Sequence, residues 1–181
     1  MRGMAVWLSI AVGVVLAIAG LWWFIDQRAD AMLTRDLPEL GHVDVPKRLE
    51  GRSPETSSGV AIFRFDRIAE GFAFMGSITP VRERLVVVAW KGGARASAVE
   101  EARQLVGERV EKLRWRLDGG VEHGVGTYVV NTRERESRLT LLVVEDAAIV
   151  VAHRVWVEDS GPAESVDLVR RVAASFRPAG R

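Results

Sequence analysis

Hydrophobic residues are concentrated in one uninterrupted run near the start of the chain. From Met4 to Ile25 there are 22 consecutive positions without a charged side chain, and Ser9 is the only clearly polar residue among them. A helix of this length would extend roughly 33 Å at about 1.5 Å per residue, against roughly 30 Å of hydrocarbon in a typical bilayer. Because a helix satisfies its own backbone hydrogen bonds, it can cross hydrocarbon where an irregular segment cannot. The pattern predicts a transmembrane anchor over residues 4–25.

A cleaved signal peptide is the alternative interpretation of this run. Ala17-Ile18-Ala19 before Gly20 fits the small-x-small pattern of a cleavage site. The apolar run nevertheless continues through Ile25, and cleavage would leave that part as an apolar N-terminus on a soluble protein. This continuation and the length of the run favour an uncleaved signal-anchor.

The charges that flank the anchor set its expected orientation. Arg2 and the terminal amine stand before it, and Arg28 and Arg35 follow it. When only basic residues are counted, the two sides of the anchor carry nearly equal positive charge. The charge directly against the anchor on the N-terminal side favours that end inside the cell. We therefore expect a single-pass protein of the cell inner membrane with its domain on the extracytoplasmic side.

Small residues recur at four-residue intervals along the anchor, at Ala5, Ser9, Gly13 and Ala17. This spacing places them on one face of a helix, where two helix backbones could approach each other closely. Self-association of the anchor through this face is one interpretation. The other is the ordinary composition of membrane helices, which are rich in such residues.

Turn-forming residues dominate the segment that follows the anchor. Pro38 interrupts any helix that continues from the anchor. Pro46 and the run 51–59 (Gly-Arg-Ser-Pro-Glu-Thr-Ser-Ser-Gly) have the composition of turns and linkers. We therefore predict a juxtamembrane linker over residues 26–59 and a folded domain over residues 60–178.

Beyond residue 59 the hydrophobic pattern alternates between strand-like and helix-like periods. Runs typical of strands are predicted at residues 60–65, 72–78, 85–90, 125–130, 139–144 and 148–157. The run 85–90 (Leu-Val-Val-Val-Ala-Trp) is apolar at every position, as expected for a central strand that is buried on both faces.

Two helices are predicted between and after these strands. Apolar residues recur at three- and four-residue steps over residues 97–117, behind a capping-box pair of Ser97 and Glu100, and predict the first helix. The second helix begins near Pro162 and stops before Pro178. The order of three strands, helix, three strands, helix predicts an α+β domain, with a mainly antiparallel sheet and two packed helices.

Charge and cysteine content narrow the classes of function. From Ala29 onward there are 23 basic residues, the chain's 25 less Arg2 and Arg28, and 23 acidic residues, its 24 less Asp26. Nucleic-acid binding needs a concentrated basic surface, so this neutral balance argues against it. The absence of Cys excludes disulfides, thiolate metal sites and a cysteine nucleophile.

Candidate chemical motifs are few. His42, His123 and His153 have no second His or carboxylate at metal-ligand spacing on a shared element. Lys91-Gly92-Gly93 lies between a predicted strand and a predicted helix but lacks the remaining Gly-Lys-Ser/Thr spacing of a phosphate loop. No serine stands in a Gly-x-Ser-x-Gly elbow. The sequence therefore predicts no catalytic, cofactor-binding or metal-binding residue.

The C-terminal half of the chain carries a family resemblance. The helix predicted at 97–117, the strands after it and the closing run 169–178 (Val-Arg-Arg-Val-Ala-Ala-Ser-Phe-Arg-Pro) resemble PsbP-like domains, whose last helix often ends in a Ser-Phe pair, here Ser175-Phe176. That superfamily includes extrinsic photosystem subunits and small bacterial envelope lipoproteins. The resemblance implies an α/β/α sandwich with an interaction or assembly role and no enzyme activity. Here an anchor helix replaces the lipidated Cys that is common in the bacterial members.

Together these patterns indicate a membrane-anchored extracytoplasmic binding or assembly module, with a membrane and a protein as its partners. Two alternatives stay open. One is an envelope hydrolase that draws an acid/base pair from scattered carboxylates. The other is a structural subunit of a membrane complex that acts through its anchor helix.

We predict that the full chain sediments with membranes and stays there after carbonate or high-salt extraction. Burial of the helix over residues 4–25 does not depend on ionic contacts, so neither treatment should release it. Cell fractionation followed by immunoblotting measures this. Recovery of a mature soluble form that begins at Gly20 would contradict the anchor and support the signal peptide.

Overall fold

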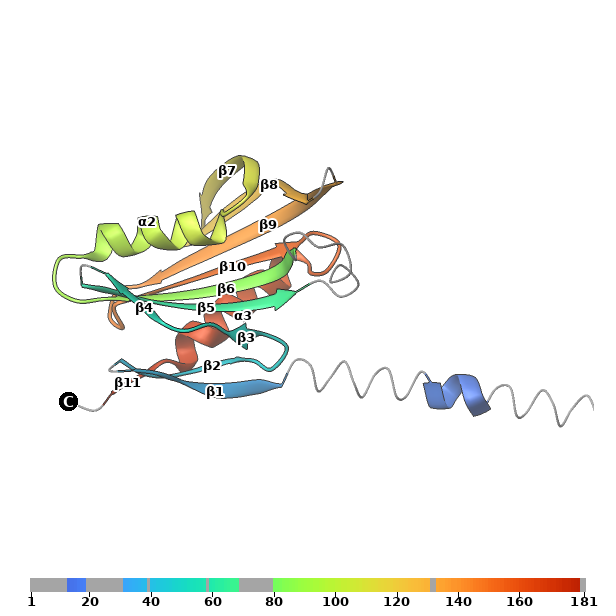
Figure 1. Cartoon of the computed structure of the whole chain (residues 1–181), viewed down its shortest axis with the longest axis horizontal. Coiled ribbons are helices and arrows are strands. Elements are labelled where there is room, and N and C mark those ends of the chain that lie inside the picture. The colour runs from blue at the N-terminus through green and yellow to red at the C-terminus, as the bar shows by residue number, and fades with distance from the viewer. Residues whose placement is uncertain are drawn as a thin grey trace, which may run out of the picture. The chain divides into compact units, whose positions relative to one another are not determined.

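Figure 1 shows the computed structural model of the chain, which describes residues 13–18, 31–38, 40–57, 59–68, 80–130 and 133–179. The chain divides into two units, one of Met1–Leu33 with Pro46–Arg48 and one of Thr34–Val45 with Leu49–Arg181. In the first unit residues 13–18 are helical, and the rest of the predicted anchor 4–25 lies outside the described residues. Within the described ranges, no helix is long and apolar enough to cross a membrane.

The second unit is built on an antiparallel sheet of eight strands. Its strand order is β3-β5-β6-β10-β9-β8-β7, and β4 pairs with β5 beside β3. The bounds are Glu50–Gly51 for β3, Glu55–Ser57 for β4, Val60–Ile68 for β5, Val81–Trp90 for β6, Val110–Asp118 for β7, Val121–Val130 for β8, Arg133–Val144 for β9 and Ile149–Trp156 for β10. A smaller sheet has the order β1-β2-β11, with β1 at Met32–Leu37, β2 at Gly41–Pro46 and β11 at Arg177–Pro178. The predicted α+β class with mainly antiparallel sheets is confirmed.

Two helices cover opposite faces of the large sheet (Figure 1). Helix α2 spans Arg95–Val106 and helix α3 spans Pro162–Ser175. Successive residues of a strand point to opposite faces. On β10, Ala152 belongs to the apolar cluster that includes α2, whereas the next residue, His153, is hydrogen-bonded to Ser165 of α3.

Strands β6 and β10 form the centre of the core, packed between the two helices. All eight residues of β10 are buried, as is every residue of β6 except Arg82. A strand covered on both faces has no side that favours polar residues, which is why the run 85–90 is continuously apolar.

The helix predicted over residues 97–117 is wrong in its second half. Helix α2 ends at Val106, and the residues from Val110 to Asp118 form β7 instead. Gly107 is the C-cap residue, and its N–H donates a 2.9 Å hydrogen bond to the Arg103 carbonyl; a Cβ at this position would lie 2.8 Å from that oxygen. The chain then takes a left-handed conformation at Arg109, with φ of 63°, which a helix does not allow.

The start of α2 also differs from the prediction. The helix begins at Arg95, two residues before Ser97, and its N-cap residue is Ala94, which makes no side-chain capping bond. The pair of Ser97 and Glu100 therefore lies inside the first turns. By contrast α3 begins at the predicted Pro162, and the Glu164 carboxylate accepts a hydrogen bond of 2.8 Å from the Gly161 N–H.

Much of the segment that was predicted as a linker, residues 26–59, forms strands. Strands β1 to β4 lie between Met32 and Ser57, and the side chains of Val43, Val45 and Leu49 are fully buried. The N–H of Asp44 donates a 2.9 Å hydrogen bond to the Ser175 hydroxyl at the end of α3. These strands are short and pair with distant parts of the chain, so local composition gives little sign of them. The strand predicted at 72–78 lies outside the described residues.

Two leucine truncations test the assignment of β7 as a strand. Leu141 on β9 is 1 % exposed, and Leu117 on β7 is 70 % exposed. We expect Leu141→Ala to lower the free energy of unfolding by about 2–5 kcal/mol and Leu117→Ala by less than about 1 kcal/mol. Denaturant unfolding of the full chain in detergent measures both. A comparable loss for Leu117→Ala would mean that residue 117 is buried, as the predicted helix required.

Candidate functional site

Five arginines line a small cavity of about 160 Å³ beyond the C-terminal end of α2. They come from the segment between β3 and β4, from β5, β6 and β10, and from the turn after α2: Arg52, Arg64, Arg84, Arg109 and Arg154. We call this cavity the arginine pocket. Glu108 and the ring of Tyr128 complete its lining, with Val81.

The sheet register brings the inner residues of this pocket together. Arg84 on β6 lies between Asp66 on β5 and Arg154 on β10 in the strand ladders. Arg84 and Arg154 stand two residues from Val86 and Ala152, which pack under α2. The same face of the sheet is therefore apolar where α2 covers it and charged where the helix has ended.

Arg84 is buried and makes four side-chain hydrogen bonds, which leave one of its five N–H groups unused. Its Nε and Nη2 donate to the two carboxylate oxygens of Asp66 at 2.7 and 3.2 Å, and its Nη1 donates to the Leu105 carbonyl at 3.0 Å and to the Glu108 carboxylate. Burial lowers the pKa of the Arg84 guanidinium, but the hydrogen bonds to both carboxylates outweigh it and raise that pKa above its ordinary value. The hydrogen bond from Arg84 lowers the pKa of Glu108.

Arg154 is buried more deeply and has no carboxylate partner among the described residues. It is 1 % exposed, and its Nη1 and Nη2 donate to the carbonyl oxygens of Glu108 at 2.8 Å and Val81 at 3.1 Å. Its guanidinium carbon lies 4.4 Å from the centre of the Tyr128 ring. Burial lowers the pKa of Arg154 to about 10, so this side chain is still charged at neutral pH.

The Nε atom of Arg154 has no hydrogen-bond partner in the part of the chain that the structure describes. The Ser137 hydroxyl and the Trp156 indole N–H are also buried without such a partner, but neither residue lines the pocket. Trp156 is two residues from Arg154 on β10, and Ser137 is the register partner of Trp156 on β9. Because unpartnered buried polar atoms are rare in folded proteins, the Nε of Arg154 marks a place that can accept a ligand or solvent.

The outer arginines give the pocket an excess of positive charge. Arg52 pairs with Asp66 at 2.9 Å, and Arg64 pairs with Glu55. Arg109 is exposed and forms no ion pair with a described residue. Five guanidinium groups therefore line the pocket with one carboxylate, that of Glu108, while Asp66 and Glu55 pair with Arg52, Arg84 and Arg64 from outside the lining.

A second polar cluster lies under α3, and its composition resembles a catalytic triad. The Nε2 of His153 is 3.0 Å from the Glu83 carboxylate, and its Nδ1 is 2.8 Å from the Ser165 hydroxyl, which also contacts Thr140 at 2.8 Å. All four side chains are buried. A nucleophile must be reachable by its substrate, so this cluster acts as a satisfied polar network that fixes α3 on the sheet.

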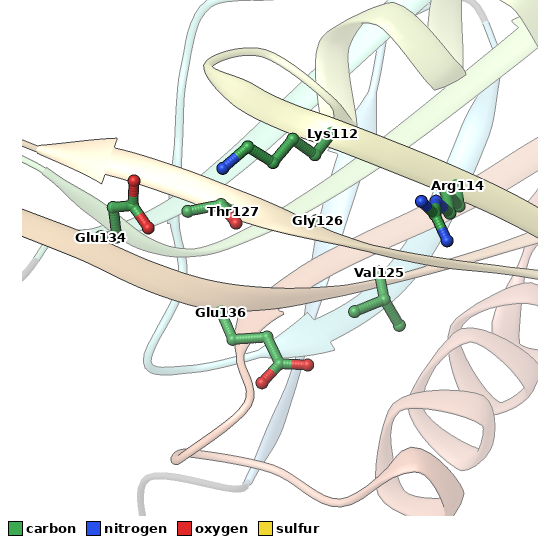
Figure 2. A pocket seen from close by; sticks show the side chains of 7 residues that line it. All are labelled: Lys112, Arg114, Val125, Gly126, Thr127, Glu134 and Glu136. Atoms are coloured by element: carbon green, nitrogen blue, oxygen red, sulfur yellow. The ribbon is translucent and has the colours of Figure 1, made fainter.

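A wider hollow of about 620 Å³ lies over β7, β8 and β9 (Figure 2). Lys112 and Arg114 stand on β7, and Glu134 and Glu136 on β9. Figure 2 shows the charged ends of these side chains standing apart around the sheet rather than converging on one point. The hollow is lined by side chains of both charges, which do not point to one place where a ligand could bind.

A third hollow, of about 390 Å³, is a more apolar groove beside β5. Pro38, Leu40, Pro54 and Phe63 contribute to it, and Lys91 lies at its edge. The Gly92-Gly93 pair after Lys91 forms a turn.

The predicted histidines do not converge on one site. The Nδ1 of His42 is 2.5 Å from the Asp36 carboxylate near the surface. His123 on β8 is the register partner of Arg116 on β7, and His153 is buried under α3. In the described ranges, no group of three or more His, Cys, Asp or Glu could hold a metal ion.

Sequence reasoning missed the arginine pocket because its residues are spread from position 52 to position 154. One local signal was present. Arg154 interrupts the apolar run 148–157, and a charged residue in the middle of a buried strand calls for a specific partner.

Comparison of the chain with models of known protein families gave no match, and a search of curated proteins gave none either.

Proposed function

We propose that this protein is a single-pass membrane-anchored module that binds an anionic ligand in the arginine pocket, on the extracytoplasmic side of the cell inner membrane. The apolar run over residues 4–25 supports the anchor. The five arginines that line a partly enclosed cavity with a single carboxylate support the anionic ligand.

The observation that carries the proposal is the environment of Arg154. A buried charge is costly unless it is paired and hydrogen-bonded. Part of its role is structural, because Arg154 satisfies the Glu108 carbonyl just after α2, where helix carbonyls lack partners and attract cations. The contact with the Glu108 carbonyl does not use the Nε donor of Arg154. It also does not explain the exposed charge of Arg109. An anion in the pocket would engage both.

The lining of the pocket favours binding over catalysis. The described residues around the pocket include no Ser, Cys or His that could serve as a nucleophile or a base. Glu108 is a poor general acid, since the hydrogen bond from Arg84 lowers its pKa and keeps it ionised. These features argue against an envelope hydrolase at this site.

The remaining interpretations stay predictions. The PsbP-like resemblance implies an interaction or assembly role, which is compatible with a binding module. In the small-residue face of the anchor, Gly13 and Ala17 are among the described residues, whereas Ala5 and Ser9 lie outside them. Self-association through this face would add to the function of the pocket rather than replace it.

Thermal unfolding of the full chain in detergent tests anion binding. We expect at least one sodium salt among acetate, citrate, glutamate, sulfate and phosphate to raise the midpoint at constant ionic strength. A ligand at 100 times its Kd adds about 2.7 kcal/mol to the free energy of unfolding. The increase should disappear in Arg154→Met, which keeps most of the side-chain volume and loses the charge.

Arg171→Met is the matched control, because Arg171 lies on the exposed side of α3 and pairs with Asp167. Its response to anions should equal that of the unaltered protein. The proposal fails if no anion raises the midpoint of the unaltered protein more than that of Arg154→Met.

A further inference from the structure

We infer that the arginine pocket selects a dianionic phosphoryl group, as carried by inorganic phosphate or a phosphate monoester. This inference rests on the proposed function and names the ligand class of the same site. Charge balance, volume and the arrangement of donors each support it.

Charge favours a ligand with more than one negative charge. Five guanidinium groups line the pocket against one lining carboxylate, that of Glu108, and the outer carboxylates of Asp66 and Glu55 balance them only in part. A monocarboxylate such as acetate would supply only one negative charge, whereas a phosphate monoester carries between about 1.5 and 2 at neutral pH. The deeply buried Arg154 makes this balance matter, because charges attract more strongly where water is excluded.

The volume of the pocket is small, at about 160 Å³. It lies below the range of about 300–1,000 Å³ that is usual for drug-sized ligands. A single tetrahedral anion fits this space, and any larger group attached to it would extend out of the mouth past Arg52 and Arg109.

The donors of the pocket are pre-organised. Arg84 is fixed by Asp66 and Glu108, and Arg154 is fixed by two carbonyls and by the ring of Tyr128. These contacts hold the guanidinium planes before a ligand arrives, which reduces the entropy lost on binding. Planar guanidinium groups match the oxygen geometry of phosphate.

Calorimetric titration of the full chain in detergent with methyl phosphate, sulfate and acetate tests the charge of the ligand. The second pKa of a phosphate monoester is about 6, so methyl phosphate is mostly a monoanion at pH 5 and mostly a dianion at pH 7. We expect its affinity to rise about tenfold between these pH values, in line with the dianion fraction. Sulfate is a dianion at both pH values, so its affinity should be the same at pH 5 and pH 7. At pH 7 acetate should bind more weakly than methyl phosphate or sulfate.

Arg109→Asn tests the site without disturbing its buried part. Arg109 is exposed and has φ of 63°, a conformation that Asn tolerates well. We expect this variant to keep the unfolding midpoint and to lose about tenfold in affinity for methyl phosphate at pH 7, the scale of one charge-assisted contact. Arg154→Met should lose at least as much affinity for methyl phosphate. Arg171→Asn removes one arginine far along α3 and should leave that affinity unchanged.

The outcomes separate this inference from the proposed function. If acetate binds as tightly as methyl phosphate, or if methyl phosphate binds equally at pH 5 and pH 7, the inferred preference for a dianion is overturned. The proposed anion-binding function would then still stand. Absence of binding by every anion tested would overturn both. Unchanged affinity in Arg109→Asn and Arg154→Met would place the phosphate elsewhere and overturn the assignment of this pocket.

The phosphoryl group could reach the pocket from solution or on a lipid headgroup, and reconstitution distinguishes these sources. The full chain is placed in nanodiscs of phosphatidylcholine with or without phosphatidic acid, whose headgroup is a phosphate monoester. If phosphatidic acid competes with methyl phosphate, the pocket accepts the lipid headgroup. If it does not, the ligand is a soluble phosphate, and either result is consistent with the inferred dianion.

Discussion

Two arginines lie side by side at the centre of the sheet, and the rest of the site depends on how their charges are stabilised. Arg84 and Arg154 are register partners on β6 and β10, in strands that are otherwise almost wholly buried. Like charges directly opposite each other destabilise a sheet. Asp66 and Glu108 balance Arg84, while Arg154 relies on carbonyl oxygens and an aromatic ring. Of these two buried arginines, Arg154 is therefore the one without a carboxylate partner among the described residues.

The need to stabilise the charges of Arg84 and Arg154 also accounts for the place where α2 ends. The carbonyls of Leu105 and Glu108 accept hydrogen bonds from Arg84 and Arg154, so these two side chains satisfy groups that a continuing helix would have used itself. A helix that ran to residue 117 would cover the sheet face where both guanidinium groups stand. Termination at Gly107 opens that face, and the chain returns as β7 at the edge of the sheet.

Residue patterns predicted the elements with a strong, local hydrophobic period. The central strand over 85–90, the run 148–157 and the helix after Pro162 all lie where the pattern placed them. The segment 110–118 was ambiguous, because Leu113, Trp115 and Leu117 alternate with charged residues as well as fitting a helical step. The strands before residue 59 and the arginine pocket depend on pairing between distant residues, which a single sequence does not reveal.

The neutral charge of the chain after the anchor is compatible with a strongly charged pocket. The 23 basic and 23 acidic residues from Ala29 onward cancel only in total, so the excess of arginines that line the pocket is matched by acidic residues elsewhere. Charges farther apart than about 8 Å are largely screened at physiological ionic strength. A ligand would therefore be attracted mainly at close range, by the guanidinium groups that touch it, rather than guided by the field of the whole domain. Selectivity then depends on the fit between the ligand's charge and the donors of Arg84, Arg109 and Arg154.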